Sequence, residues 1–213
     1  MNRPRLFLVT PPEFDPADMA AKLKKAFDGG DIACVLIYMP GAGTKDLQAA
    51  AAKLVPVIQE GGAAAIVYRD TQAAGRSGAD GVHVDTSLED LKLAVESFRP
   101  ERIVGTGGTK LKHDAMEWAE TGADYILFGK LDLAEKEKAH DKTLRSAAWW
   151  AELFETPCVA LAGNSLDSLG EVAATGADFV ALKDAVWQSG EDVSSVIARA
   201  NEILEQHPFP EVE

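Results

Sequence analysis

The chain has 213 residues, of which 46% are hydrophobic and 26% are charged, and its formal net charge at pH 7 is -13. This length and composition predict one globular domain over residues 1–213, with a substantial apolar core and a C-terminal tail at 207–213. The strong negative charge argues against non-specific nucleic-acid binding and against attachment to an anionic membrane surface.

The sequence contains two cysteines and only a short apolar run near its start. Cys34 and Cys158 lie within apolar stretches, which favours buried free thiols over a disulfide or a nucleophile. The apolar residues 6–9 are too few for a secretory signal or a membrane span. These features predict a cytoplasmic protein that binds neither membrane nor nucleic acid.

Short apolar runs alternate with helical segments along the chain. Strands are predicted at 6–9, 32–38, 63–68, 81–84, 102–106, 125–128, 157–161 and 179–182. Helices are predicted at 17–27, at 44–59 with Thr44 as its cap, and at 71–77, 111–120, 143–154 and 192–206. Thr86 or Ser87 is expected to cap a helix that ends at 98, and Asn164 and Ser165 a helix that ends at 174.

One cassette, a small hydroxyl residue followed by Gly-Ala-Asp, occurs three times, at 77–80, 121–124 and 175–178. Each copy lies between a helical segment and an apolar run. Its glycine can adopt the left-handed conformation that ends a helix. We therefore interpret the cassette as a helix-to-strand joint, and the separation of the copies fits two strand–helix units each.

Eight strands that alternate with eight helical segments predict a parallel sheet closed into a (β/α)₈ TIM barrel. An open doubly wound sheet is the alternative. In a barrel of this kind the active site lies at the carboxyl ends of the strands. The cassettes enter the strands and so belong to the opposite face, and the candidate site residues are those that follow each strand.

The ends of the last two strands predict a phosphate site. Loops at this place in a barrel commonly bind phosphate through backbone N–H groups at a helix start. Gly163 permits close approach of an anion, Asn164 and Ser165 open a helix, and Lys183, followed by Asp184, adds positive charge. The alternative is a plain helix cap with a solvated lysine.

A second glycine-rich turn follows the fifth strand and contains Thr106, Gly107 and Lys110. Its hydroxyl groups and lysine are suited to a second phosphate, although it lacks the spacing of a P-loop. An ordinary tight turn explains the same residues.

Polar residues also follow the second, third and fourth strands. Tyr38 and Tyr68 are candidate substrate-binding residues, and His83 is either an acid–base residue or a core histidine. Asp85 points to the same side of its strand as His83, and with Asp70 it offers oxygen ligands for Mg²⁺.

A charged loop from Lys130 to Lys142 follows the sixth strand. Its near-neutral balance of charges in an acidic chain fits a mobile lid over an anionic ligand, and a merely solvated loop is the alternative. Lys130, together with His83 and Lys110, is a candidate catalytic group.

Several stretches resemble the thiamine phosphate synthase family and its relative, thiazole tautomerase. They are residues 6–10, 78–83, 122–129, 160–163 and 176–178. The resemblance covers nearly the whole chain and implies a (β/α)₈ barrel. It also implies an enzyme of thiamine biosynthesis that joins a pyrimidine diphosphate to a thiazole phosphate with Mg²⁺ and releases diphosphate.

The sequence departs from the family at its catalytic motifs. The Asn-Asp pair after strand three falls on Tyr68 and Arg69, and the acid after the fourth strand falls on Leu88. The Arg and Lys of strand two fall on Tyr38 and Pro40. The resemblance thus implies a divergent member, with altered groups at the diphosphate and metal end of the site.

Two other functions stay open from the sequence. One is a different reaction on a phosphorylated or heterocyclic small molecule, and the other is a non-catalytic binding barrel. The oligomeric state, a homodimer included, is open as well.

Overall fold

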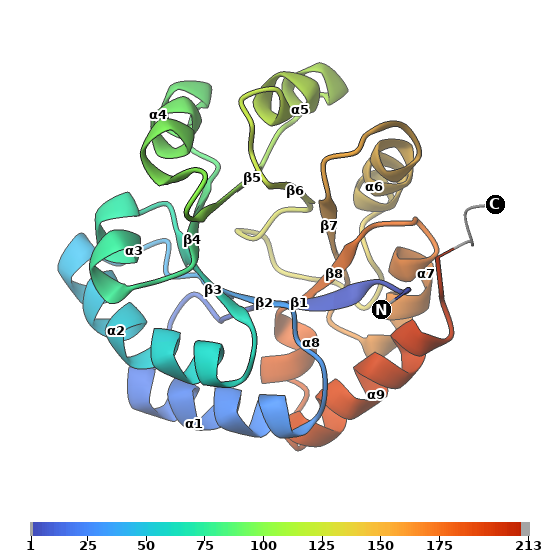
Figure 1. Ribbon diagram of the computed structural model, residues 1–213. Helices are drawn as coiled ribbons and strands as arrows, with labels where there is room; N and C mark the ends of the chain where they lie inside the picture. Colours follow the sequence, from blue (N-terminus) through green and yellow to red (C-terminus); the bar gives the residue numbers. More distant parts are fainter. Residues whose placement is uncertain (1, 210–213) are drawn as a thin grey trace.

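The computed structural model describes residues 2–209, and its strands close into one barrel (Figure 1). The eight strands of these residues are all parallel and pair in chain order, with β8 returning to β1. They are β1 (Arg5–Val9), β2 (Cys34–Ile37), β3 (Ala64–Tyr68), β4 (Gly81–Val84), β5 (Ile103–Gly107), β6 (Tyr125–Phe128), β7 (Cys158–Leu161) and β8 (Phe179–Leu182). The predicted (β/α)₈ barrel is confirmed, and the doubly wound alternative is excluded.

Helices surround the barrel and connect successive strands (Figure 1). They are α1 (Pro16–Asp28), α2 (Thr44–Glu60), α3 (Thr71–Ser77), α4 (Leu88–Phe98), α5 (Lys112–Ala119), α6 (Asp141–Leu153), the 3₁₀ turn η1 (Leu166–Ser168), α7 (Leu169–Ala173), α8 (Asp184–Trp187) and α9 (Val193–Glu205). The short α8 was not predicted. Of the expected tail, residues 210–213 lie outside the described residues.

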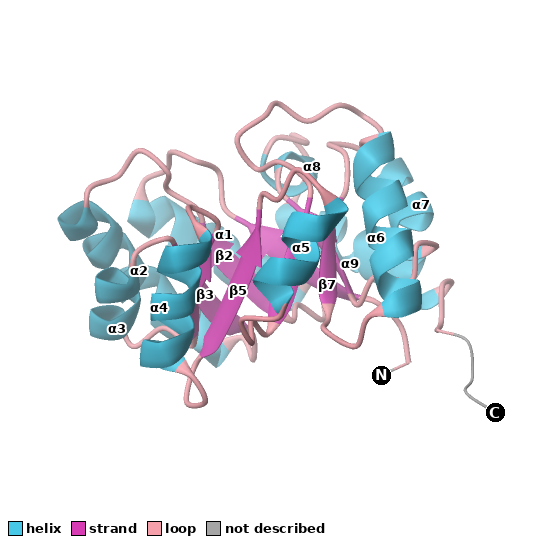
Figure 2. Ribbon diagram, turned by 90° about the horizontal axis from the view of Figure 1, so that it is seen from above, coloured by secondary structure: helices cyan, strands magenta, loops and turns pink. Residues whose placement is uncertain are grey.

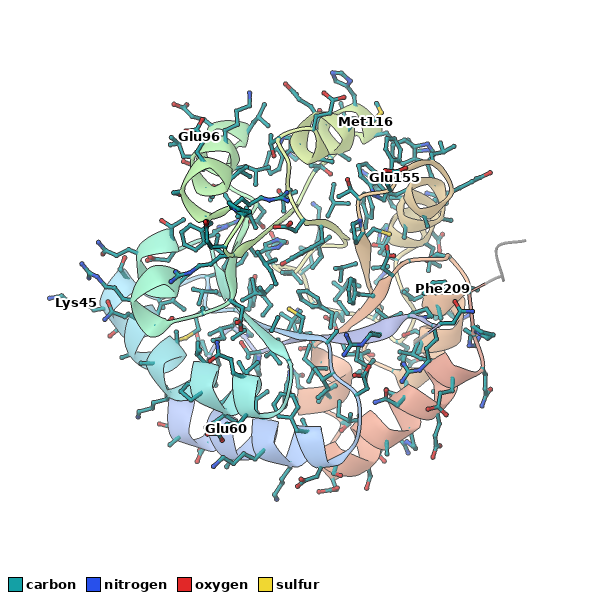
Figure 3. All side chains as sticks on the ribbon, in the orientation of Figure 1. Lys45, Glu60, Glu96, Met116, Glu155 and Phe209 are labelled. Carbon is teal, nitrogen blue, oxygen red and sulfur yellow. The ribbon has the colours of Figure 1, made fainter. Side chains whose placement is uncertain are left out.

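The apolar residues form two layers, because strands of a parallel barrel are buried on both faces. The larger layer packs between the strands and the helices. The smaller fills the barrel interior (Figure 3), with Phe7, Val9, Cys34, Leu36, Tyr38, Ile66, Tyr68, Tyr125, Leu127, Leu131, Val159, Leu161 and Ala181. The interior is therefore a packed core, and a ligand has room only at its rim.

The three cassettes lie where helices turn into strands, as predicted. Their glycines Gly78, Gly122 and Gly176 have φ of 72°, 95° and 80°, the left-handed region that ends a helix without a Cβ clash. Each aspartate carboxylate also accepts a hydrogen bond from a backbone N–H of the preceding strand, at 2.7 to 2.8 Å. The cassette thus ends a helix and ties its new strand to the neighbouring one.

Most predicted caps are confirmed, and one is wrong. The hydroxyl groups of Ser87 and Ser165 accept backbone N–H bonds at the starts of α4 and η1. Thr44 is the first residue of α2 and Gly43 is its N-cap, since the extended residue before the helix is the glycine. 

Cys34 and Cys158 are buried and free, which confirms the expected thiols. Burial raises the pKa of Cys158 to about 12, which does not suit a nucleophile. Among residues 2–209, the helices all fall short of the length and apolarity needed to span a membrane.

Candidate active site

The carboxyl ends of the strands surround a cavity of about 270 Å³. Figure 2 shows this rim at the top, with α8 beside it, and the N-terminus at the opposite end of the barrel. The cavity is lined by Tyr38, Pro40, Tyr68, Arg69, His83, Asp85, Gly108, Lys110, Leu127, Gly129, Lys130, Leu131 and Asp132. The structure thus brings together predicted residues from five successive strands, β2 to β6.

One wall of the cavity is a series of aromatic rings. The rings of Tyr38 and Tyr68 meet edge to face with centroids 4.7 Å apart, and Tyr68 stacks on His83 at 6.0 Å. His83 in turn stacks on Tyr125 at 5.6 Å. Flat aromatic faces of this kind suit a planar heterocycle, because rings gain dispersion and quadrupole interactions when they pack.

His83 is buried in this wall, and its Nδ1 lies 3.0 Å from the hydroxyl oxygen of Tyr125. Burial lowers the pKa of His83 to about 4, an effect that the charge of Asp85 only partly opposes. The imidazole is therefore neutral near pH 7. It lines the cavity as a polar ring and carries no proton that it could donate as an imidazolium.

Arg69 follows β3 in a conformation that few side chains adopt. Its φ is 61°, and its N–H donates to the carbonyl of His83 at 2.7 Å. Its guanidinium lies 4.6 Å from the centre of the Tyr68 ring, and its Nε donates to Asp85 at 2.5 Å. Non-glycine residues in the left-handed region are uncommon and cluster at functional sites. The backbone therefore places a cation at the cavity edge at some conformational cost.

The predicted Mg²⁺ ligands do not form a metal site. The Asp70 carboxylate accepts from the N–H of Ala73 and caps α3, while both oxygens of Asp85 bond to Arg69 and Tyr68. Over residues 2–209, the structure contains no group of three or more His, Cys, Asp or Glu side chains placed to hold a metal ion. Mg²⁺ prefers oxygen ligands, and of the two carboxylates that line the cavity, Asp85 and Asp132, the predicted ligand Asp85 is already paired with a guanidinium. The residues present therefore do not fit this cofactor.

Two further cations reach the same cavity. Lys110 lies in the turn after β5, and Lys130 follows Gly129, just after the end of β6. The Nζ of Lys142 donates to the carbonyl of Lys110 at 2.7 Å, so the charged loop supports the turn that carries Lys110. Both predicted catalytic lysines thus lie at the rim.

The rest of the glycine-rich turn has a structural role. The Thr106 hydroxyl donates to the carbonyl of Val84 at 2.7 Å, and Thr106 is completely buried. Gly107 belongs to β5, where a Cβ would lie 2.8 Å from the carbonyl oxygen of Leu127. Neither residue lines the cavity, and only Gly108 and Lys110 of this turn do so.

A second charged position lies beside the cavity, at the end of β8. Lys183 and Glu135 form an ion pair with 3.4 Å between Nζ and Oε1, and each side chain is only 5% exposed. The other oxygen of Glu135 accepts from the N–H of Asp184 at 3.2 Å. Burial raises the pKa of Glu135, although the charge of Lys183 opposes this. The predicted phosphate-binding lysine thus faces a buried carboxylate of the chain itself.

The charged loop also covers the end of β7 and enters the barrel mouth, where it is yellow in Figure 1. The N–H of Asn164 donates to the carbonyl of Lys136 at 2.8 Å, and that of Gly163 to the hydroxyl of Ser168 at 2.9 Å. A Cβ on Gly163 would lie 2.3 Å from the carbonyl oxygen of Glu137. The glycine is therefore needed for close approach of the loop. Of the predicted phosphate donors, the Asn164 N–H is engaged by the loop and the Gly163 N–H by Ser168 of η1.

Sequence reasoning missed the roles of three residues. Tyr125 appeared only within a cassette, although its ring lies where a Cβ on Gly105 would be and thus requires that glycine. Arg69 adjoined two predicted site residues, so its position after β3 was a usable signal. Glu135 reaches Lys183 only through the folded loop, and the sequence holds no signal for that pairing.

The fold and this rim define a class: a (β/α)₈ barrel with cations and an aromatic wall at the carboxyl ends of its strands, as in barrels that act on phosphorylated molecules. Comparison with known proteins gives the family. A family model for thiamine monophosphate synthase matches residues 6–186. The chain belongs to this family of transferases, and the resemblance seen in the sequence is confirmed.

Individual relatives agree. The thiamine-phosphate synthase of Rhodospirillum centenum is 34% identical over 201 residues, which cover 94% of this chain and 97% of the relative. That of Hyphomonas neptunium is 29% identical over 209 residues, 95% of each chain. The solved structure of thiamine phosphate pyrophosphorylase from Pyrococcus furiosus shares the fold, with a TM-score of 0.78 at 24% identity, covering 96% of this chain and 97% of that one.

Proposed function

We propose that the chain is a thiamine phosphate synthase, which joins a pyrimidine diphosphate to a thiazole phosphate and releases diphosphate. The observation that supports this proposal is the presence of two groups of cationic side chains on one rim. Arg69, Lys110 and Lys130 line the cavity, and Lys183 with the N–H of Asp184 faces a buried carboxylate beside it. A reaction between a diphosphate and a monophosphate requires two such groups.

The chemistry asks the protein for positive charge and orientation. The bond between the pyrimidine's carbon and a diphosphate oxygen breaks, its electron pair leaves on the diphosphate, and the thiazole forms a new bond to that carbon. Cations placed where this charge develops stabilise the transition state, and the cavity lysines and Arg69 supply them. The aromatic wall of Tyr38 and Tyr68 orients the planar ring. Neutral His83 fits a step in which no proton is transferred.

The monophosphate is expected at Lys183. The Asp184 N–H donates to Oε2 of Glu135, and the Lys183 ammonium lies 3.4 Å from Oε1 while its own hydrogen bonds go to the carbonyls of Leu131 and Leu133. Oε1 of Glu135 accepts no hydrogen bond from any residue in the described part of the chain, so this internal anion is incompletely satisfied. A phosphate has more charge and more acceptor oxygens than a carboxylate, and can replace it. Binding then requires the loop from Lys130 to Lys142 to move, as a lid does.

The proposal also covers the ligands, the cellular compartment, the metal and the oligomeric state. The ligands are phosphorylated small molecules, and the two buried free thiols accord with a reducing, cytoplasmic compartment. Mg²⁺ has no part in this proposal, because Asp85 is engaged by Arg69 and Asp70 caps a helix. Assembly as a homodimer remains a proposal that size measurement in solution would test.

The test is a turnover assay with both substrates. Thiamine phosphate and diphosphate should appear in equal amounts when the two substrates are mixed with the protein, and neither should appear when one substrate is omitted. Lys183→Ala should raise the KM for thiazole phosphate with less effect on the pyrimidine diphosphate. Lys136→Ala, on the exposed part of the same loop, is the matched control. Binding of both substrates without product would instead support a non-catalytic barrel.

A further inference from the structure

We propose that the diphosphate is held by the guanidinium of Arg69 in place of a divalent cation, so that this chain binds diphosphate without metal. The inference rests on the proposed function, because it names the group that receives the diphosphate of that reaction. It concerns the cavity edge formed by Tyr68, Arg69 and Asp85.

Arg69 is held in a fixed position at the cavity edge. Its backbone is held in the left-handed region by the hydrogen bond to His83, and its guanidinium lies over the Tyr68 ring while Nε bonds to Asp85. The guanidinium of Arg69 is therefore oriented before any ligand binds. An oriented guanidinium loses little conformational entropy on binding and presents a planar fork that matches phosphate oxygens in pairs.

The Arg69 guanidinium keeps donors that no protein acceptor in residues 2–209 uses. A guanidinium has five N–H groups and no acceptor. Nε of Arg69 donates to Asp85, and within residues 2–209 its two Nη groups donate to no acceptor. The side chain is 43% exposed, so these groups face the solvent of the rim. Arg69 thus keeps an open fork for an anion.

The carboxylate at this edge of the cavity is already engaged by protein donors. Within residues 2–209, Asp85 is the one carboxylate that follows β3 or β4 and also lines the cavity. Its oxygens accept hydrogen bonds from Arg69 at 2.5 Å and from the Tyr68 hydroxyl at 3.1 Å. A divalent ion bound to Asp85 would have to displace a guanidinium and then lie beside its positive charge. The same carboxylate instead orients Arg69, in the way an acid orients a cationic binding group.

The cavity is locally positive. The cavity lining contains three cations, Arg69, Lys110 and Lys130, against two carboxylates, Asp85 and Asp132. This local excess of positive charge occurs in a chain whose net charge is -13. A concave site of one sign attracts ligands of the other, so the cavity is the place on this acidic protein where a diphosphate is expected.

The test uses inorganic pyrophosphate as the probe, titrated calorimetrically into the full chain with EDTA and again with excess Mg²⁺. The expected result is saturable binding in EDTA that Mg²⁺ does not strengthen. Arg69→Asp should weaken the binding in EDTA by tenfold or more, because it replaces a paired cation by a carboxylate. The same variant places two carboxylates side by side, so that Mg²⁺ should now restore binding.

Arg69→Asp is compatible with the backbone, since aspartate tolerates the left-handed conformation better than arginine does. Arg76→Asp is the matched control: it reverses the same charge on α3, where Arg76 bonds to Gln48 outside the cavity. Arg76→Asp should leave the affinity nearly unchanged. An equal loss in the two variants would show a general charge effect and overturn the inference.

The wild-type titration decides the matter even if a variant fails to fold. Pyrophosphate binding that appears only with Mg²⁺ would overturn the metal-free inference while leaving the synthase proposal intact. Binding in EDTA combined with no synthase turnover would instead contradict the proposed function and support the metal-free anion site.

Discussion

Replacing Glu135 by glutamine tests the exchange of an internal carboxylate for a ligand phosphate. Glutamine keeps the size of the side chain and an acceptor for the Asp184 N–H, but removes the charge that faces Lys183. Since Glu135 must leave before phosphate enters, its loss of charge should make phosphate binding stronger.

The size of this gain in phosphate affinity follows from the geometry of the Lys183–Glu135 pair. At 3.4 Å, and with an effective dielectric constant of about 20, Lys183 and Glu135 attract each other by about 5 kcal/mol. Desolvation of two side chains that are only 5% exposed offsets most of this attraction. The net attraction that is left is roughly 1.5–3 kcal/mol, comparable to a hydrogen bond to a charged group, although Oε1 accepts no hydrogen bond from the described residues. Affinity for phosphate should thus increase by about tenfold to about a hundredfold.

Isothermal titration with inorganic phosphate measures this directly. Glu137→Gln is the control, because it makes the same change of formal charge at an exposed residue of the same loop. The reasoning predicts a gain for Glu135→Gln alone, and loss of that gain when Lys183→Ala is added. Equal affinities of the two glutamine variants would refute it, as would a gain that survives without Lys183.

Three further predictions concern the frame of the site. The pKa of His83 is lowered to about 4 in the folded protein, so on acidification the unfolded chain takes up a proton first. The unfolding free energy should therefore fall by up to about 3 kcal/mol between pH 6.5 and pH 4. Urea titrations of His83→Gln should no longer show this dependence on pH. Gly105→Ala should lower the melting temperature sharply, since a Cβ would lie 1.9 Å from the Tyr125 ring, whereas Gly43→Ala, with open space around its Cβ, should not. Asp124→Ala leaves a backbone N–H of β5 unpaired and should lower the free energy of unfolding, measured by chemical denaturation, by about 1–3 kcal/mol. A change near zero would contradict the role given to the cassettes.

The barrel could be predicted because its signals are local. The strands at 179–182 and 81–84 lie where they were predicted, since each is an apolar run that begins just after a cassette. The short α8 escaped prediction because four residues are too few to show a helical period. Thr44 was misjudged as a cap because glycine and threonine are both suitable at that position.

The site was predictable only as far as strand ends determine it. Tyr38, Tyr68, His83 and Asp85 line the cavity because each follows or ends a strand. Their pairings, such as His83 with Tyr125 and Asp85 with Arg69, were not predictable, since they depend on how side chains from different strand ends meet in the folded barrel. Asp70 caps α3 although the sequence places it beside the other site residues. 

The predicted phosphate-binding residues also have partners that the sequence did not reveal. Lys183 was expected to face solvent or a ligand, and the structure instead pairs it with Glu135 from a distant loop. Gly163 was expected to approach an anion, and it is the carbonyl oxygen of Glu137 that approaches its Cα. Contacts made by a long loop depend on its path, which composition alone does not specify.

A crystal structure of the protein with thiazole phosphate bound tests the central claim most directly, because it locates the monophosphate relative to the loop. The account predicts phosphate oxygens within hydrogen-bonding distance of Lys183 Nζ and the Asp184 N–H, with the Glu135 carboxylate withdrawn from both. A phosphate bound elsewhere while Glu135 keeps its 3.4 Å contact with Lys183 would contradict it.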